Sequence, residues 1–328
     1  MSKKNFVYVL VSLCAVLLII NVIIDANRDK PVPVKPTSFS TKEIENKFSE
    51  VLKQYNLENE WTTVKYIDNE NYDSLKKVFY VRLPRDISIP IIINDIYQAF
   101  QSDPVKIEAI ERKNYSNSTL KIYSEDLLKM QAFLNHDDGI KRKFAELSFY
   151  VLMKNYKGTE EIIDSLLNMH INYNLLLIPG EESRAFLQEV KKNDMVYSVL
   201  INDDMEDRFK IEEDYTKQMI KNSVVNLISV YGRNINYIVD TRSNLYNSVI
   251  FSFVRDEFSK RDISLSLVTD YSSTLGRDFN DIISLFNFYC ESGVSKERIK
   301  IIIDFDSFIR LEPLIIKEKK RGTKFSVR

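Results

Sequence analysis

The sequence VYSVLINDDMED at residues 196–207 decides the fold. Its apolar run predicts a buried strand over residues 196–202, and acids follow directly where that strand should end. Residues 213–229 come next and carry apolar side chains at helical spacing, which predicts a helix with one buried face. A buried strand followed by an amphipathic helix is the repeating unit of a parallel α/β sheet.

The same unit recurs on both sides of this stretch. From residue 145 onward the pattern predicts strands at 148–153, 173–178, 196–202, 236–240, 264–269, 298–304 and 324–327. Helices are predicted between them near 160–169, 183–192, 213–229, 242–260, 278–291 and 313–321. The last helix is expected to start at Pro313 and to end before Gly322. About seven parallel strands alternating with helices predict an α/β fold, a distorted (β/α) barrel at residues 143–328.

Residues 41–135 follow a different pattern. A helix at 41–55, two strands, a second helix at 91–100 and two more strands predict a small α+β domain with an antiparallel sheet. The strands are expected at 61–67, 77–83, 105–110 and 119–123. The turn-rich residues 135–139 are expected to join this domain to the barrel.

The N-terminal residues 1–25 predict a transmembrane anchor. The stretch from Phe6 to Ile24 has no charged residue and is long enough to cross a bilayer as a helix. Because two lysines precede it, the N-terminus is expected in the cytoplasm and the bulk of the chain outside, held to the cell membrane by a single pass. The alternatives are a cleaved signal peptide and a lipoprotein modified at Cys14. Residues 26–40 are proline-rich and predict a semi-rigid linker.

Composition excludes several functions. The formal net charge of −1 gives no general attraction for nucleic acid, so no nucleic-acid partner is expected. The chain has 7 glycines and no glycine-rich phosphate loop. It has 2 cysteines, one of them inside the predicted anchor, so no intrachain disulfide framework is expected.

Several short phrases within the barrel region carry a family resemblance. They are Gly158–Leu167 as a first helix, Leu176–Pro179 as a strand that ends in proline, Val199–Glu206, and the closing Arg321–Val327. In these phrases and in the order of its elements, the chain resembles the divergent polysaccharide deacetylase family, a branch of the carbohydrate esterases with a distorted seven-stranded (β/α) barrel. The resemblance covers residues 143–328, and Tyr80–Asp86 resembles the smaller domain that precedes the barrel in some members.

The resemblance implies a metal site whose residues are replaced in this chain. Active relatives carry an aspartate pair after the first strand and histidines after later strands, which hold a metal that activates water. Here Lys154-Asn155 stands at the pair, Asn202 replaces one histidine, and residues 236–240 and 304–306 have none. His136 is expected in the joint between the domains, and His170 at the end of the first helix as a packed or dipole-facing residue, neither at a strand end. The expectation is no metal, no cofactor and no inherited catalytic residue.

Acids remain at the predicted strand ends. They are Asp203, Asp204, Glu206, Asp240, Asp270, Asp304 and Asp306. One interpretation is structural, because aspartate caps helices and makes turns. The other is a binding site for amino sugars, a cationic group or a hard cation such as Mg²⁺ or Ca²⁺. Paired carboxylates are also the acid and base of glycosidases.

Two functions follow as hypotheses. The first is a membrane-anchored, extracytoplasmic, non-catalytic protein of the cell envelope, with a carbohydrate-binding or scaffold role and envelope polysaccharide or amino sugar as its partner. The second is a hydrolase that acts on envelope polysaccharide, either a deviant deacetylase or an enzyme that uses the acidic strand ends. The sequence does not identify a protein partner.

Overall fold

The computed structural model describes residues 38–67, 75–112, 117–142, 144–292 and 298–327. The predicted anchor at 1–25 and most of the linker at 26–40 lie outside these residues. Within the described part of the chain, no helix is long and apolar enough to cross a membrane. The chain divides into two compact units. One contains the described residues up to Ser49 with Thr62–Val81 and Ile89–Asn135, and the other contains Glu50–Trp61, Arg82–Ser88 and His136 onward.

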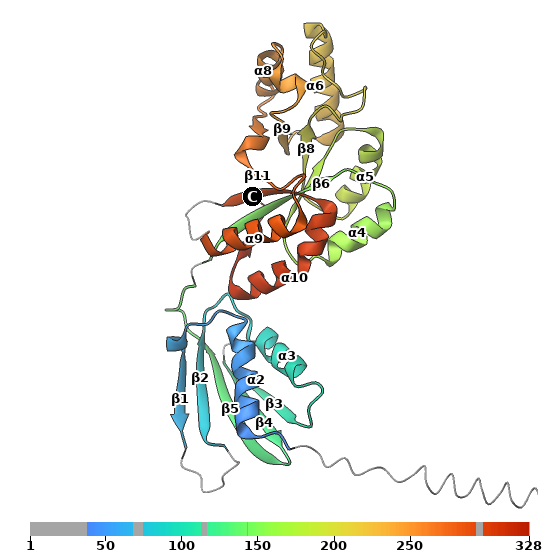
Figure 1. Cartoon of the computed structure of the whole chain (residues 1–328). Coiled ribbons are helices and arrows are strands. Elements are labelled where there is room, and N and C mark those ends of the chain that lie inside the picture. The colour runs from blue at the N-terminus through green and yellow to red at the C-terminus, as the bar shows by residue number, and fades with distance from the viewer. Residues whose placement is uncertain (1–37, 68–74, 113–116, 143, 293–297, 328) are drawn as a thin grey trace, which may run out of the picture. The chain divides into compact units, whose positions relative to one another are not determined.

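The first unit is a five-stranded sheet in the order β1-β2-β5-β4-β3 with two helices (Figure 1). Its elements are α2 (Thr41–Lys53), whose last residues are counted with the other unit, β1 (Thr62–Tyr66), β2 (Lys77–Leu83), α3 (Ile89–Ala99), β3 (Lys106–Arg112), β4 (Asn117–Ser124) and β5 (Leu127–His136). The short η1 (Asn59–Trp61), which precedes β1 in sequence, belongs to the other unit. The β1–β2, β3–β4 and β4–β5 pairs are antiparallel. Helix α2 packs on this sheet: Phe48 is fully buried, and its ring lies 5.4 Å from that of Phe79 in β2.

Strand β5 is the one element of this unit that the sequence pattern missed. Met130, Ala132 and Leu134 are fully buried at alternating positions, as a strand in the middle of a sheet requires. The tight turn from β4 to β5 is made by Glu125 and Asp126, with φ of 52° and 61°. Such turns usually contain glycine or asparagine, which tolerate positive φ, and these residues mark the turn in the sequence. Without that signal the hairpin was not predicted, and His136 ends a strand here instead of lying in a turn.

The second unit contains the parallel sheet. Its order is β10-β9-β8-β7-β6-β12-β11, with β13 paired to β6, and every one of these pairs is parallel. The strands are β6 (Glu146–Met153), β7 (Asn174–Leu177), β8 (Tyr197–Ile201), β9 (Asn236–Val239), β10 (Leu265–Leu267), β11 (Ser272–Ser273), β12 (Ile299–Asp304) and β13 (Lys324–Phe325). The seven predicted barrel strands are confirmed, with the fifth, predicted at 264–269, divided into β10 and β11. The fold is therefore an α/β parallel half-barrel.

The segment from β10 to β11 crosses the barrel gap, by which we mean the opening between the two edges of the curled sheet. Strand β10 pairs with β9 at one edge of the sheet, and β11 pairs with β12 at the other. Only η2 (Val268–Asp270) and Tyr271 separate the two short strands in sequence. One segment therefore leaves one edge of the curled sheet and joins the opposite edge.

Helices surround the strands (Figure 1). They are α4 (Thr159–Asn168), α5 (Glu181–Lys192), α6 (Lys217–Tyr231), α7 (Asn244–Asn247), α8 (Phe251–Ser259), α9 (Phe279–Ser292) and α10 (Phe305–Arg321). One core packs between helices and strands, and it includes Phe149, Val151, Phe186 and Phe308. A smaller core faces the inside of the curled sheet, and it includes Tyr150, Leu176, Leu200, Ile238 and Ile302. The two faces of each strand are thus both apolar over the middle of the sheet, as expected for parallel strands.

Helix α10 differs from its prediction. It starts at Phe305, eight residues before the expected start at Pro313, which lies inside the helix. Phe308 and Leu311 are almost fully buried, so the earlier turns are fixed by packing. Proline removes one donor from the helix interior, a cost that this packing offsets. The end is as expected: Gly322 follows the helix with φ of 118°.

Candidate functional site

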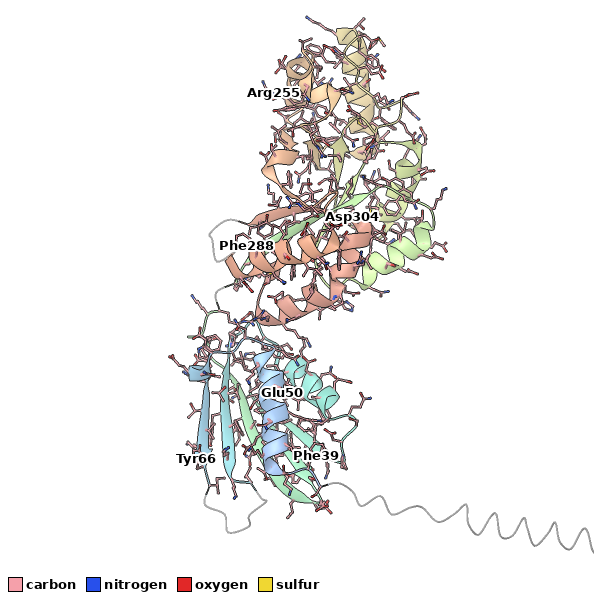
Figure 2. The ribbon with its side chains drawn as sticks, in the orientation of Figure 1. Phe39, Glu50, Tyr66, Arg255, Phe288 and Asp304 are labelled. Atoms are coloured by element: carbon pink, nitrogen blue, oxygen red, sulfur yellow. The ribbon has the colours of Figure 1, made fainter. Side chains whose placement is uncertain are left out.

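The carboxyl ends of the parallel strands bring together the positions that the resemblance singles out. Lys154 and Asn155 directly follow β6, Asn202 follows β8, and Asp240 follows β9. Asp304 is the last residue of β12 (Figure 2). In parallel α/β folds, ligands bind at this edge of the sheet. We refer to this end of the sheet as the barrel mouth.

A cavity of about 410 Å³ opens at the barrel mouth between the ends of β6, β7 and β8. Its polar lining includes Lys154, Glu182, Ser183, Asp204 and Glu206, and its apolar lining includes Met153, Tyr156, Ile178 and Pro179, with Gly180. Two of the candidate acids, Asp204 and Glu206, thus lie in one cavity with Lys154. Asp203 lines a neighbouring cavity of about 280 Å³, and Asp240, Asp270, Asp304 and Asp306 line neither.

Three of the candidate acids cap helices. Asp304 Oδ1 accepts a hydrogen bond from the Ser307 amide at 2.9 Å, at the start of α10. The carboxylate of Asp203 accepts from the Asn244 amide at 3.0 and 3.1 Å, at the start of α7. Glu206 Oε2 accepts from the Glu181 amide at 2.7 Å, at the start of α5. Each carboxylate satisfies an amide that the helix leaves without a partner and lies at the positive end of the helix dipole.

The remaining acids are held locally. Asp204 accepts from the Asn202 side-chain amide at 2.9 Å. Asp270 accepts from the Leu267 amide at 2.9 Å. Asp306 is exposed in the first turn of α10. These contacts are the turn-making and capping roles of the structural interpretation.

Asp240 forms an ion pair with Arg242. The guanidinium lies 3.0 Å from Asp240 Oδ2, and the Arg242 amide donates to Oδ1 at 3.0 Å. Burial alone would raise the pKa of Asp240, but the hydrogen bonds and charge of Arg242 outweigh it and lower the pKa. Asp240 is therefore ionised at neutral pH.

The residues at the barrel mouth do not fit the metal that the resemblance implies. A divalent ion needs several donors that converge on one point. Among the described residues, no group of three or more His, Cys, Asp or Glu side chains is placed to hold a metal ion. Lys154 brings a positive charge where the family has a base, and Asn202 gives its amide to Asp204. The seven acids are spread around the rim, each with its own structural or exposed position.

The two histidines lie away from the barrel mouth. His136 is the last residue of β5 in the antiparallel sheet, so the expectation that neither histidine ends a strand is wrong. Its Nδ1 is buried and has no hydrogen-bond partner in the described parts of the chain. His170 is exposed and not packed, and it follows α4, where its carbonyl oxygen accepts from Lys319.

Sequence reasoning missed the group that shapes the floor of the mouth cavity. Gly180 donates its amide to Ser183 Oγ and to the Tyr231 hydroxyl, both at 3.0 Å. A Cβ on Gly180 would lie 2.6 Å from Glu206 Oε1, so only glycine leaves room for the capping carboxylate. The Tyr156 hydroxyl donates to the Met153 carbonyl at 3.1 Å. The available signal was one of the chain's 7 glycines, placed directly after Pro179 and three residues after the end of β7.

Comparison with known proteins adds similarities to solved structures. No family model and no curated protein matches the chain. The chain is similar to a CE4 esterase from Streptococcus mutans at 12% identity, over 56% of this chain and 86% of the other, with a TM-score of 0.38. It is similar to a polysaccharide deacetylase from Bacillus cereus at 14% identity, over 57% and 92%, with a TM-score of 0.36.

A third similar structure is a mutant of a CE4 family pseudoenzyme with restored enzymatic activity. Identity is 11%, over 70% of this chain and 94% of the other, with a TM-score of 0.37. These solved structures are of the class that the sequence resembles, the polysaccharide deacetylases. The fold of the chain itself follows from its own parallel strand order.

Proposed function

We propose that the chain is a membrane-anchored, extracytoplasmic, polysaccharide-deacetylase-like protein that binds envelope carbohydrate or acts as a scaffold and does not catalyse. Residues 1–25 would form the anchor, 26–40 the linker, 41–135 a small domain and 143–328 the barrel. The observation that carries the proposal is the barrel mouth, where Lys154 and Asn202 stand at the inherited metal-site positions and the acids cap helices or make turns.

The mouth cavity is suited to a sugar with a cationic group. Its carboxylates, Glu182, Asp204 and Glu206, outnumber its single cation, Lys154. Carboxylates accept hydrogen bonds from hydroxyl and ammonium groups, and these bonds are stronger when the donor is charged. The apolar side, with Ile178 and Pro179, offers surface to the carbon face of a ring. An amino sugar with a free amine combines these features.

The test is calorimetric titration of the purified chain with glucosamine oligomers and with their N-acetylated counterparts. We expect the free-amine oligomers to bind roughly tenfold more tightly, since an excess of carboxylates favours a cation, and the preference should weaken with salt. Asp204→Asn should reduce the binding. Asp207→Asn is the matched control, because its side chain is 97% exposed and does not line the cavity. Equal binding of both oligomers would contradict the preference for a cationic sugar, and no binding of either would contradict the carbohydrate-binding role and leave the scaffold role.

The second candidate function is a hydrolase that uses the carboxylates of the barrel mouth. Asp204 and Glu206 in one cavity are the observation in its favour. Against it, Glu206 is hydrogen-bonded to the Glu181 amide as a helix cap. Hydrolysis of any of these oligomers during the titration would support this second function.

A further inference from the structure

A ring of polar side chains lies inside the sheet near the amino ends of the strands. Five strands carry a polar residue two positions before the apolar residue that faces the interior core. The pairs are Ser148 before Tyr150, Asn174 before Leu176, Ser198 before Leu200, Asn236 before Ile238 and Lys300 before Ile302. Because side chains alternate along a strand, both members of each pair face the same side. The interior thus changes from apolar to polar toward the amino ends.

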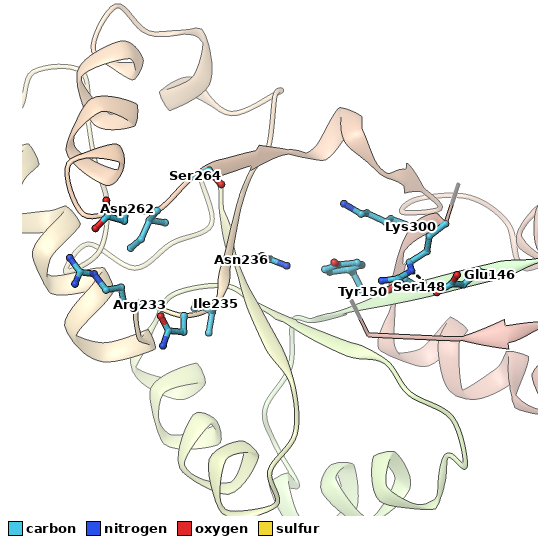
Figure 3. A pocket seen from close by; sticks show the side chains of 12 residues that line it. Glu146, Ser148, Tyr150, Arg233, Ile235, Asn236, Asp262, Ser264 and Lys300 are labelled. Carbon is cyan, nitrogen blue, oxygen red and sulfur yellow. Dashed lines mark hydrogen bonds and ion pairs between the residues drawn. The ribbon is translucent and has the colours of Figure 1, made fainter. Parts of the chain in front are cut away.

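A cavity of about 960 Å³ opens at this polar ring (Figure 3). Ser148 and Tyr150 of β6, Asn236 of β9 and Lys300 of β12 line it, with Arg233, Asp262, Ser264 and other residues that precede the strands. Figure 3 shows Lys300 and Asn236 directed into the cavity from opposite sides, with Tyr150 between them. The segment that crosses the barrel gap pairs with β12 only at Ile301 and Ile302, so the sheet is open beside Lys300.

Two buried polar atoms of the ring have no hydrogen-bond partner among the residues that the structure describes. They are Asn174 Oδ1 and Ser198 Oγ, in side chains that are 2% and 0% exposed. Asn174 is paired in register with Tyr150, and Ser198 with Asn236, so each lies beside a residue that lines the cavity. Buried polar groups in folded proteins nearly always have partners. The ring therefore offers unused hydrogen-bonding capacity next to an open cavity.

The side chains that line the cavity include more cations than anions. Arg298 is paired with Glu146 at 2.7 Å. Arg233 donates to the Arg261 carbonyl at 3.0 Å and forms no ion pair within the described part of the chain. The Lys300 ammonium lies 5.3 Å from the centre of the Tyr271 ring and has no carboxylate within 4 Å among the described residues. With Asp262 as the other acid, the lining holds three cations and two anions.

We propose that this amino-end cavity binds a small hydroxylated anion, of the class of sugar acids and sugar phosphates. The Lys300 ammonium binds the anionic group as a compact point charge. Asn236 and Ser264, which line the cavity, donate to and accept from hydroxyl groups. The site is separate from the barrel mouth, because Ser148 and Lys154 are six residues apart along the same extended segment, about 20 Å. The inference therefore stands or falls independently of the proposed function.

The test is calorimetric titration of the full chain with glucose 6-phosphate, glucuronate and glucose. We expect at least one of the two anionic sugars to bind and glucose to bind at least tenfold more weakly. Lys300→Met should weaken the binding of the anionic ligand about tenfold or more. Lys221→Met is the matched control and should leave binding unchanged, since Lys221 is exposed on α6 and does not line this cavity.

Asn236→Asp provides a second, independent variant. A carboxylate opposite Lys300 should compete with the ligand anion and weaken its binding, with the unfolding temperature of each variant measured to show that the fold is intact. Comparing the affinities for glucuronate and glucose 6-phosphate shows whether the site prefers a carboxylate or a phosphate as the anionic group. No binding of either anionic sugar, equal binding of glucose, or equal affinities for Lys300→Met and Lys221→Met would overturn the proposal.

Discussion

At the scale of single residues, the acids of the barrel mouth show what a sequence can and cannot specify. Their places at the strand ends were predicted, because a parallel strand in this chain is a plain apolar run and its end is easily found. Their roles were left open between capping and binding. The role of Asp203 depends on Asn244, from which α6 and β9 separate it along the chain, and a contact of that kind follows only from the packing of the fold.

Asp240 gives a prediction about pH. Replacing it with asparagine keeps a side chain that can accept the Arg242 amide but removes the charge. Because Arg242 is 73% exposed and the pair is screened by water, we expect a loss of only about 0.5–1 kcal/mol in unfolding free energy at pH 7. The folded-state pKa is below the reference value of 3.8. The stabilisation is therefore present above that value and is lost as the pH falls through the folded-state pKa.

The measurement is urea unfolding of wild type and Asp240→Asn from pH 7 to pH 2.5. The difference in unfolding free energy should shrink toward zero at the acid end. Asp207→Asn, at an exposed position, should change stability by less than about 0.5 kcal/mol at neutral pH. A difference between wild type and Asp240→Asn that grows as the pH falls would contradict the assigned ion pair.

At the scale of elements, the sequence predicted the barrel better than the smaller unit. The strands of a parallel sheet are buried on both faces and are recognised as apolar runs. Strand β5 was missed because its turn uses Glu125 and Asp126 at positive φ. The start of α10 was missed because proline favours a first helical position, whereas here the burial of Phe308 extends the helix past it. Tertiary packing overrode a local preference in both places.

The start of α5 provides a test of how Gly180 and Glu206 act together. Removing the cap with Glu206→Ala should cost about 1 kcal/mol of unfolding free energy. Gly180→Ala should cost a similar amount. The added Cβ would lie 2.6 Å from Glu206 Oε1, which is too close, so the carboxylate would have to move away from the helix. Once the carboxylate is gone, the added methyl meets no obstacle, and the backbone at Gly180 is extended, with φ of −174°. The double variant should therefore be no less stable than Glu206→Ala alone.

Unfolding of the four proteins in urea, arranged as a double-mutant cycle, measures the coupling directly. We expect a coupling energy of about 1 kcal/mol. Strictly additive losses would mean that Gly180 does not make room for the cap, and the geometry of the mouth floor would need another explanation.

At the scale of the whole molecule, the topology stays a prediction that rests on residues 1–25. The uncharged run after Lys3 and Lys4 predicts that the folded units lie outside the cytoplasmic membrane. Protease added to intact spheroplasts should then degrade the chain from Thr41 onward, while a cytoplasmic control protein stays intact. The mature chain should keep its first residue. Full protection, or a mature N-terminus near Asn27, would contradict the anchor.

The central claim for the molecule is that its barrel mouth does not hydrolyse N-acetyl groups by metal-assisted chemistry. That reaction needs an activated water, a Lewis acid on the carbonyl oxygen and a proton for the departing amine. Lys154, Asn155 and Asn202 stand where the first two would be supplied. The most direct measurement is acetate release from chitin oligomers and peptidoglycan fragments by the purified chain supplied with Zn²⁺, Co²⁺ or Ni²⁺.

We expect no acetate above a heat-denatured control. Asp304→Asn is the informative variant, because asparagine is as good a helix cap as aspartate and should leave α10 intact while removing the charge. Metal-dependent acetate release that disappears in Asp304→Asn or Asp204→Asn, with the unfolding temperature unchanged, would contradict the account and establish the acids of the barrel mouth as a catalytic centre.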